Sequence, residues 1–228
     1  MNDLAQNLIE ELQCETVFTI PVLGGIPVSE AVVVTWIIMA VLVVIAFILT
    51  RNLKVDHISK RQAVAESIVT GLLNMVHGMV GEKGKAYVPY LTTVMLYIGV
   101  SNIIGLFGFK SPTKDLRVTV ALALMSIILI EAAGIYHKGV KRWLHGFVEP
   151  VAIVTPINIL EVVTKPLSLC MRLFGNVLGA FVIMELLKMI LPVGLPVVFS
   201  LYFDIFDGLL QAYVFVFLTS LYIDEITE

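Results

Sequence analysis

A single arginine lies inside the most apolar part of the sequence. Arg172 is the last arginine of the chain, and Lys188 is the only lysine after it. A guanidinium in the middle of a membrane costs about 2.5–3.5 kcal/mol on insertion scales, and it cannot avoid that cost, because it stays protonated in proteins. Glu185, the only acid between the two, falls on another helix face. We therefore expect the balancing anion from another segment, such as Asp204 or Asp207, or from another protein.

Polar and small residues share the helix face of Arg172. At about 100° per residue, one arc of the helical wheel contains Glu161, Lys165, Ser168, Arg172, Gly175, Asn176 and Gly179. The opposite side is apolar. The two glycines either leave room for a partner that passes close to the backbone or serve ordinary helix packing. Lys165 either pairs with Glu161 one turn earlier or extends to the membrane surface.

A second polar stripe lies near the end of the chain. Asp204, Asp207 and Gln211 fall within about 60° on a helical wheel, with Ser200 between them. An aspartate in an otherwise apolar segment is costly unless it is solvated, paired or protonated. If the two segments pack as an antiparallel hairpin, the two stripes can meet.

The composition defines the class of protein that holds these side chains. Hydrophobic residues make up 58% of the 228 residues and charged residues only 14%, against roughly 25% in soluble domains. The apolar runs are continuous over about 20 residues, which indicates membrane helices and excludes a barrel. We therefore predict an all-α integral membrane protein. The net charge of −3 gives no indication of a nucleic-acid partner, and the four histidines show no metal-ligand spacing, so neither a metal nor a cofactor is expected.

The apolar runs predict about five membrane-crossing helices and one amphipathic helix at the interface. The crossing segments are residues 31–50, 86–109, 116–136, 157–191 and 195–223, and the interfacial helix covers 62–79. The last two exceed the roughly 20 residues that cross upright, so they must be tilted or bent. They form the hairpin of residues 156–224. We expect an acidic segment over residues 1–30 and a single polytopic membrane domain over residues 31–228.

The distribution of positive charge sets the orientation. Residues 1–30 contain no lysine or arginine, whereas residues 51–85 contain six and residues 137–149 contain three. The positive-inside rule therefore places the N-terminus outside and the C-terminus in the cytoplasm. The loop at residues 110–117, which also carries three positive charges, opposes this assignment locally.

Four stretches resemble one known family, subunit a of the F-type ATP synthase, over roughly residues 30–224. The stretch KPLSLCMRLFGN (165–176) resembles the family's arginine signature, and PINILEVVTKP (156–166) resembles its lead-in. SPTKDLRVTVALAL (111–124) resembles a helix entry of the family, and LLQAYVFVFLTSLYI (209–223) resembles its C-terminal helix. Arg172 matches the family's essential arginine, Gln211 the glutamine that faces it, and Asn176 the asparagine one turn later.

The resemblance implies an ion-translocating stator subunit that is not catalytic by itself. It would lie against a rotating c-subunit ring, offer two aqueous half-channels and couple proton or sodium flow to ATP synthesis. Ser168, Gly175 and Gly179 would then face the rotor. The further implied partners are the b subunit of the peripheral stalk, the rest of the complex and membrane lipid, and the implied location is a bacterial plasma membrane.

The sequence departs from the family pattern at the positions that usually form one half-channel. Phe181 stands where many members carry Glu or His, and Asp204 stands where many carry His or Glu. Asp204 and Asp207 together, or Glu185 one turn beyond Phe181, are the replacements that we consider. We place the two aspartates in the outer half-channel, with an ion pair to Arg172 as the competing interpretation.

Two other functions compete with the stator. A secondary transporter or an ion-driven motor stator would work without a c ring, and it would carry its site between its own helices. An intramembrane enzyme would need a Ser/His or a metal-binding His/Glu motif at membrane depth, and neither motif is present in the sequence.

Overall fold

The structure, a computed structural model, describes residues 16–20, 26–51, 53, 59–107, 111–146, 155–190 and 194–227. Within these residues, five helices are long and apolar enough to cross a membrane. This confirms the predicted all-α membrane architecture. The first 15 residues of the expected acidic segment lie outside the described part of the chain.

A short β-hairpin precedes the first helix, which the sequence analysis did not predict. Strand β1 (Thr16–Ile20) pairs antiparallel with β2 (Ile26–Ser29). Ser29 is buried, and its hydroxyl donates a 2.9 Å hydrogen bond to Asp115. The hairpin is thereby tied to the start of a later helix, 86 residues along the chain.

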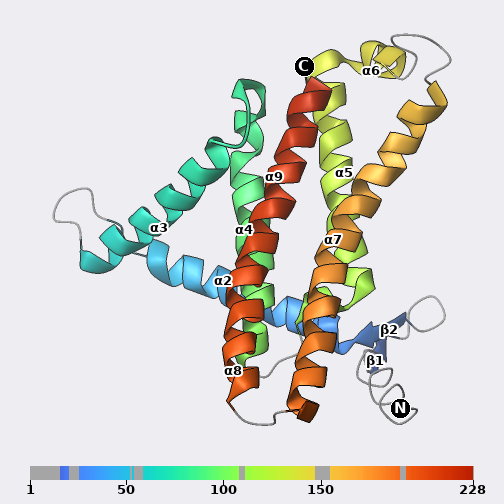
Figure 1. Ribbon diagram of the computed structural model, residues 1–228. Coiled ribbons are helices and arrows are strands. Elements are labelled where there is room, and N and C mark those ends of the chain that lie inside the picture. The colour runs from blue at the N-terminus through green and yellow to red at the C-terminus, as the bar shows by residue number, and fades with distance from the viewer. Residues whose placement is uncertain are drawn as a thin grey trace.

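The next two helices diverge from the rest of the molecule (Figure 1). Helix α2 (Glu30–Thr50) corresponds to the first predicted span, and most of its side chains beyond Ile38 are exposed. Helix α3 (Lys60–His77) corresponds to the predicted amphipathic helix. The hydroxyl of Ser59 caps it by accepting a hydrogen bond from the backbone N–H of Gln62. The position of α3 at a membrane interface stays a prediction.

Helices α4 and α5 form the centre of the fold. Helix α4 (Val88–Ile103) lies between the short 3-10 turns Glu82–Tyr87 and Ile104–Phe107. A third 3-10 turn, Pro112–Lys114, leads into α5 (Leu116–Lys138). Gly139, with φ of 77°, then redirects the chain into the short helix α6 (Val140–Gly146), because glycine takes this left-handed backbone without steric cost.

The predicted long hairpin is present, but its second arm is not a uniform α-helix. Helix α7 (Thr155–Ile190) has 36 residues, which makes it about 54 Å long at 1.5 Å per residue. After α8 (Leu195–Ser200), the chain runs through a π-helical segment (Leu201–Asp207) into α9 (Gly208–Thr227). The wider π turn changes the angle between successive side chains, so a wheel at 100° per residue does not hold through Asp204 and Asp207. The sequence-based wheel was wrong in this respect.

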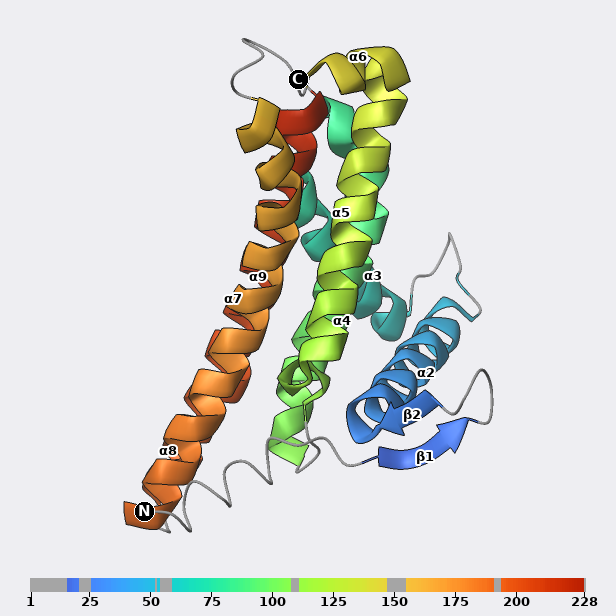
Figure 2. The same ribbon diagram turned by 90° about the vertical axis from the view of Figure 1, so that its right-hand side faces the viewer.

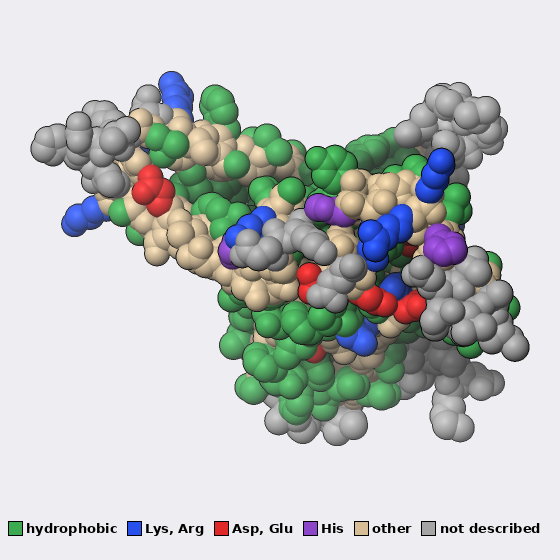
Figure 3. All heavy atoms as spheres, turned by 90° about the horizontal axis from the view of Figure 1, so that it is seen from above, with side chains coloured by type: hydrophobic (Ala, Val, Ile, Leu, Met, Phe, Trp, Pro, Cys, Tyr) green, Lys and Arg blue, Asp and Glu red, His purple; other side chains and the backbone are tan. Residues whose placement is uncertain are grey.

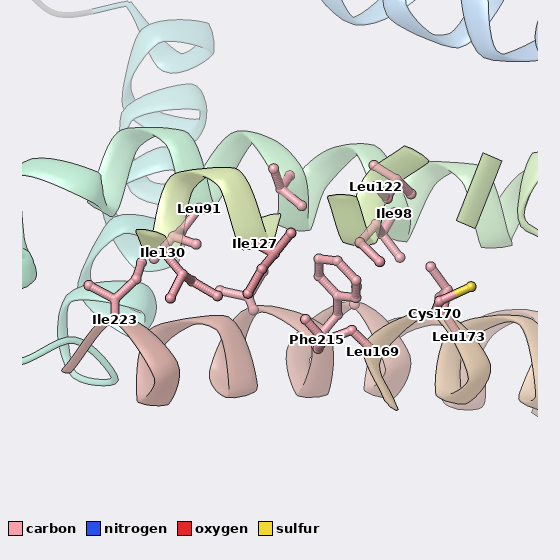
Figure 4. Packing of buried hydrophobic residues seen from close by; sticks show 14 of the residues in the cluster. Leu91, Ile98, Leu122, Ile127, Ile130, Leu169, Cys170, Leu173, Phe215 and Ile223 are labelled. Carbon is pink, nitrogen blue, oxygen red and sulfur yellow. The ribbon is translucent and has the colours of Figure 1, made fainter. Parts of the chain in front are cut away.

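The core lies among helices α4, α5, α7 and α9, which run side by side (Figures 1 and 2). Helix α9 packs chiefly on α4 and α5, whereas α7 packs chiefly on α5. Figure 4 shows side chains from all four helices meeting in this layer: Leu91, Ile98, Leu122, Ile127, Ile130, Leu169, Cys170, Leu173, Phe215 and Ile223. Apolar contact thus fixes one side of α7 and leaves its other side uncovered.

Candidate functional site

Arg172 lies on the uncovered side of α7. Leu169 and Leu173, on either side of it in the sequence, are each 1% exposed and belong to the core, whereas Arg172 itself is exposed. Among the described residues, no acidic side chain pairs with the guanidinium. The absence of an anion from its own helix was predicted from the sequence. Here none of the other described segments supplies one either.

Open space surrounds the small residues next to Arg172. A methyl group added at Gly175 or at Gly179 would meet no atom within 4 Å, and Ser168 on the same face is exposed. Gly134 differs from both, because a carbon added there would lie 2.8 Å from Ile226. In the described part of the chain, Gly175 and Gly179 are therefore not helix-packing glycines. The alternative that they pack within this chain was wrong.

The two polar stripes meet at one point, as the hairpin prediction required. The amide of Asn176 on α7 donates to both carboxylate oxygens of Asp207 in the π segment, at 2.8 and 2.7 Å. Asp204 instead accepts a 2.8 Å hydrogen bond from the hydroxyl of Ser200. Within the described residues neither aspartate forms an ion pair with Arg172. The competing interpretation of a simple ion pair is therefore wrong for this structure.

The remaining predicted site residues lie at different depths. Gln211 is 8% exposed on α9, and its position opposite the arginine stays a prediction. Glu185 is half-buried on α7, 13 residues after Arg172, which is about 20 Å along the helix axis. Phe181 lies under the ammonium group of Lys114, 3.9 Å from the ring centroid. No sequence pattern marked Lys114, because only tertiary folding brings its 3-10 turn to α7.

A charged cavity of about 430 Å³ lies at the end of the bundle where α5, α6, α7 and α9 come together. Viewed from this end, charged side chains gather over the same helices (Figure 3). The ammonium of Lys165 lies 3.4 Å from Glu161 and 3.1 Å from Glu225. The pair with Glu161 was one of the two alternatives that the four-residue spacing left open, whereas Glu225, 60 residues away, was missed. Glu131 on α5 accepts a 2.8 Å hydrogen bond from Trp143 on α6.

A buried polar network lies around Ser101 and Asn102 at the end of α4, two residues to which the sequence assigned no role. The amide of Asn102 donates to the carbonyl of Gly208 at 2.9 Å, and its oxygen accepts from Thr113 at 2.7 Å. The hydroxyl of Ser111 lies 2.7 Å both from the carbonyl of Ser101 and from the hydroxyl of Thr113. The network joins α4, the 3-10 turn before α5 and the end of the π segment.

The geometry comprises an exposed arginine on a long membrane helix, open glycines beside it, and a carboxylate held by an amide one turn away. Among the described side chains, no group of three or more His, Cys, Asp or Glu residues is arranged to hold a metal ion. The arrangement presents a fixed positive charge on an uncovered helix face, with polar groups at two depths on the same hairpin. Such a face can attract and release an anionic group that comes from outside this chain.

Several known proteins are similar in sequence to this chain over most of its length. The family model described as ATP synthase A chain matches residues 32–224. ATP synthase subunit a of Moorella thermoacetica is 35% identical over 203 residues, which cover 88% of this chain and 92% of that relative. The protein of Propionigenium modestum named ATP synthase subunit a, sodium ion specific, is 35% identical over 216 residues, covering 87% of this chain and 74% of that protein. ATP synthase subunit a 1 of Chlorobaculum parvum is 33% identical over 208 residues, or 90% and 91% of the two chains.

These matches confirm the family that the arginine, helix-entry and C-terminal stretches resemble. They also agree with the five helices that can cross a membrane within the described residues. The chain therefore belongs to the ATP synthase A chain family, whose members are membrane-embedded subunits of a multi-subunit complex that links ion transport to ATP synthesis.

Proposed function

We propose that this subunit translocates a proton or a sodium ion between two aqueous half-channels and that Arg172 separates them. In this proposal Arg172 faces a ring of c subunits, each carrying a carboxylate within the membrane. One observation supports it most: Arg172 is exposed on α7, without an anionic partner among the described residues. An unpaired guanidinium in a membrane is costly, and in this proposal an anion on another chain relieves that cost.

The physics of the two charges gives the mechanism. A neutral carboxylic acid moves through lipid at low cost, whereas an ionised carboxylate does not. The opposite charge of Arg172 favours the ionised form of a carboxylate that approaches it. A rotor site therefore releases its ion near Arg172, passes as an anion and is reloaded on the far side. Each charge that crosses the membrane yields about 2.3 kcal/mol per 100 mV.

The outer half-channel of this proposal runs along the hairpin beyond Arg172. Asp204 and Asp207 supply its polar wall, since water relieves the cost of an aspartate in an apolar segment. Asn176 holds the carboxylate of Asp207 one turn beyond Arg172. Glu185 is the further candidate, because it lies on the same helix about 20 Å beyond the arginine.

The inner half-channel opens, in this proposal, from the cavity among α5, α6, α7 and α9. Lys165 and Glu161 line that cavity, and Lys165 precedes Arg172 by seven residues, or about 10 Å along the helix. Ser168 lies between them on the exposed face of α7. With the N-terminus outside and the C-terminus in the cytoplasm of a bacterium, this cavity faces inward. The b subunit of the peripheral stalk completes the set of proposed partners.

Replacing Arg172 tests the proposal. In vesicles that contain the purified complex, Arg172→Ala should abolish ATP synthesis driven by an imposed ion gradient while the subunit still assembles. Arg172→Lys should fail nearly as badly, because an ammonium can deprotonate when buried and lacks the planar fork. Arg117→Ala, at an exposed position near the start of α5, is the matched control and should remain active.

Two results would contradict the proposal. Wild-type rates of ATP synthesis in the Arg172→Ala complex would show that the guanidinium is dispensable. Purification in mild detergent without a c ring or soluble catalytic subunits would instead favour the alternative, a transporter or motor stator that works without a c ring.

A further inference from the structure

The π segment Leu201–Asp207 lies at the centre of the outer half of the hairpin and carries both aspartates. π-helical turns are rare, and they occur frequently at functional sites. Because the α-helical alternative is ordinarily favoured, contacts outside the segment must hold this backbone. The question is which side chains do so.

Helix α4 and its 3-10 extension lie directly against this segment. A carbon added at Gly208 would lie 2.7 Å from Asn102, and one added at Gly105 would lie 3.3 Å from the carboxylate of Asp204. Asn102, in the last turn of α4, thus lies against the backbone at Gly208, and Gly105, in the 3-10 turn that follows, lies against the side chain of Asp204. At Gly208, the absence of a side chain is what allows so close an approach.

Asn102 forms a hydrogen bond to the backbone in this contact. It is 5% exposed, and its amide donates to the carbonyl of Gly208, the residue that follows Asp207. The hydroxyl of Thr113, which is 0% exposed, donates to the side-chain oxygen of Asn102. An amide held at both ends cannot rotate without leaving a buried polar group unsatisfied, which is costly. The backbone at Gly208 is therefore fixed relative to α4 and to the turn before α5.

We propose that Asn102 is a positioning residue that, with Thr113, sets the register of the π segment so that Asp207 meets Asn176. The inference deepens the proposed function, since it rests on Asp207 acting in the outer half-channel beside Arg172. Helix α7 is held by α5 rather than by the π segment. The alignment of Asp207 with α7 thus depends on the opposite side of the segment, where Asn102 binds.

Cross-linking in the assembled complex tests this inference independently of ion transport. In a chain with Cys14 and Cys170 replaced by alanine, one cysteine pair is placed at Asn176 and Asp207. A reference pair is placed at Lys165 and Glu225, at the other end of the hairpin. A short bifunctional thiol reagent is added, and the cross-linked peptides are quantified by mass spectrometry.

Asn102→Leu should lower the 176–207 cross-link about tenfold relative to the 165–225 cross-link, a factor within reach of one buried hydrogen bond. Thr92→Val is the matched control, because this buried hydroxyl on α4 bonds only its own helix, at Val88. It should leave the ratio unchanged. If Asn102→Leu does not assemble, Thr113→Val should lower the ratio in the same way and Thr113→Ser should restore it.

An unchanged ratio in both Asn102→Leu and Thr113→Val would overturn the inference. An equal fall of both cross-links with loss of the subunit would also overturn it, because that result indicates general stability rather than positioning. A fall of the 176–207 cross-link alone would support the inference even if the Arg172→Ala complex were active. The inference and the proposed function can therefore fail separately. If both hold, ATP synthesis should decrease in parallel with the 176–207 cross-link.

Discussion

Leucine at Gly175 or Gly179 should leave this subunit stable and yet slow the complex. A carbon added at either glycine meets no atom within 4 Å, so the first carbon of the side chain displaces no described part of the chain. Leucine is a better helix former than glycine by about 0.8–1 kcal/mol. The free energy of unfolding of the subunit should therefore stay level or rise slightly.

The effect on function should be opposite in sign, because the proposed rotor passes over this face. Overpacking of a fitted interface costs about 1–3 kcal/mol. If that cost falls on each passage of a rotor helix, the rate decreases about 5- to 150-fold. We expect this loss in ATP synthesis by reconstituted vesicles that contain matched amounts of complex, with subunit content measured on gels.

Two glycine controls separate the alternatives. Gly71→Leu on α3 also meets open space, but it lies away from Arg172, so it should leave the rate unchanged and the stability level or slightly higher. Gly134→Leu would place its first carbon 2.8 Å from Ile226 and should destabilise the subunit. Normal ATP synthesis in both Gly175→Leu and Gly179→Leu would refute the idea that this face meets a moving partner.

The remaining predictions concern the polar groups at the two ends of the hairpin. Asp204→Asn and Asp207→Asn should slow ion flux without lowering the amount of subunit, and Phe181→Glu should restore part of the flux; loss of the subunit instead would indicate a structural role. Asp204→Cys and Asp207→Cys should react with water-soluble thiol reagents added outside right-side-out vesicles, and protection of both would exclude the outer half-channel. Glu225 is 55% exposed, so a double-mutant cycle between Lys165→Ala and Glu225→Ala should give a coupling of at most about 1 kcal/mol in the thermal unfolding of the complex, and a much larger value would show that this ion pair fixes the hairpin.

The family resemblance and the apolar helices could be predicted from the sequence because both depend on residues that are close together along the chain. The thickness of a bilayer sets the length of an apolar run, so the spans matched the helices to within a few residues. The period of 3.6 residues sorts the side chains of one helix into faces. That period correctly separated the exposed Arg172 and Gly175 from the buried Leu169 and Leu173.

The same period failed where the backbone left the α-helix. The wheel through Asp204 and Asp207 assumed a uniform turn, and the π segment changes it. Apolar residues surround this segment in the sequence, so hydrophobicity carries no sign of the wider turn. Its contacts, between Asn102 and Gly208 and between Gly105 and Asp204, involve α4 and the 3-10 turn after it, about a hundred residues earlier in the chain.

By itself, then, the sequence determined which residues form helices long and apolar enough to cross a membrane, which face of α7 carries Arg172, and that the arginine lacks an anion in its own helix. Only the tertiary structure decided which groups meet across helices. Asn176 with Asp207, Lys165 with Glu225 and Asn102 with Gly208 are pairs separated by 31, 60 and 106 residues. The physical reason is that periodicity reports the face a side chain occupies on its own helix, whereas the partner on that face depends on how the apolar sides of all four bundle helices pack together.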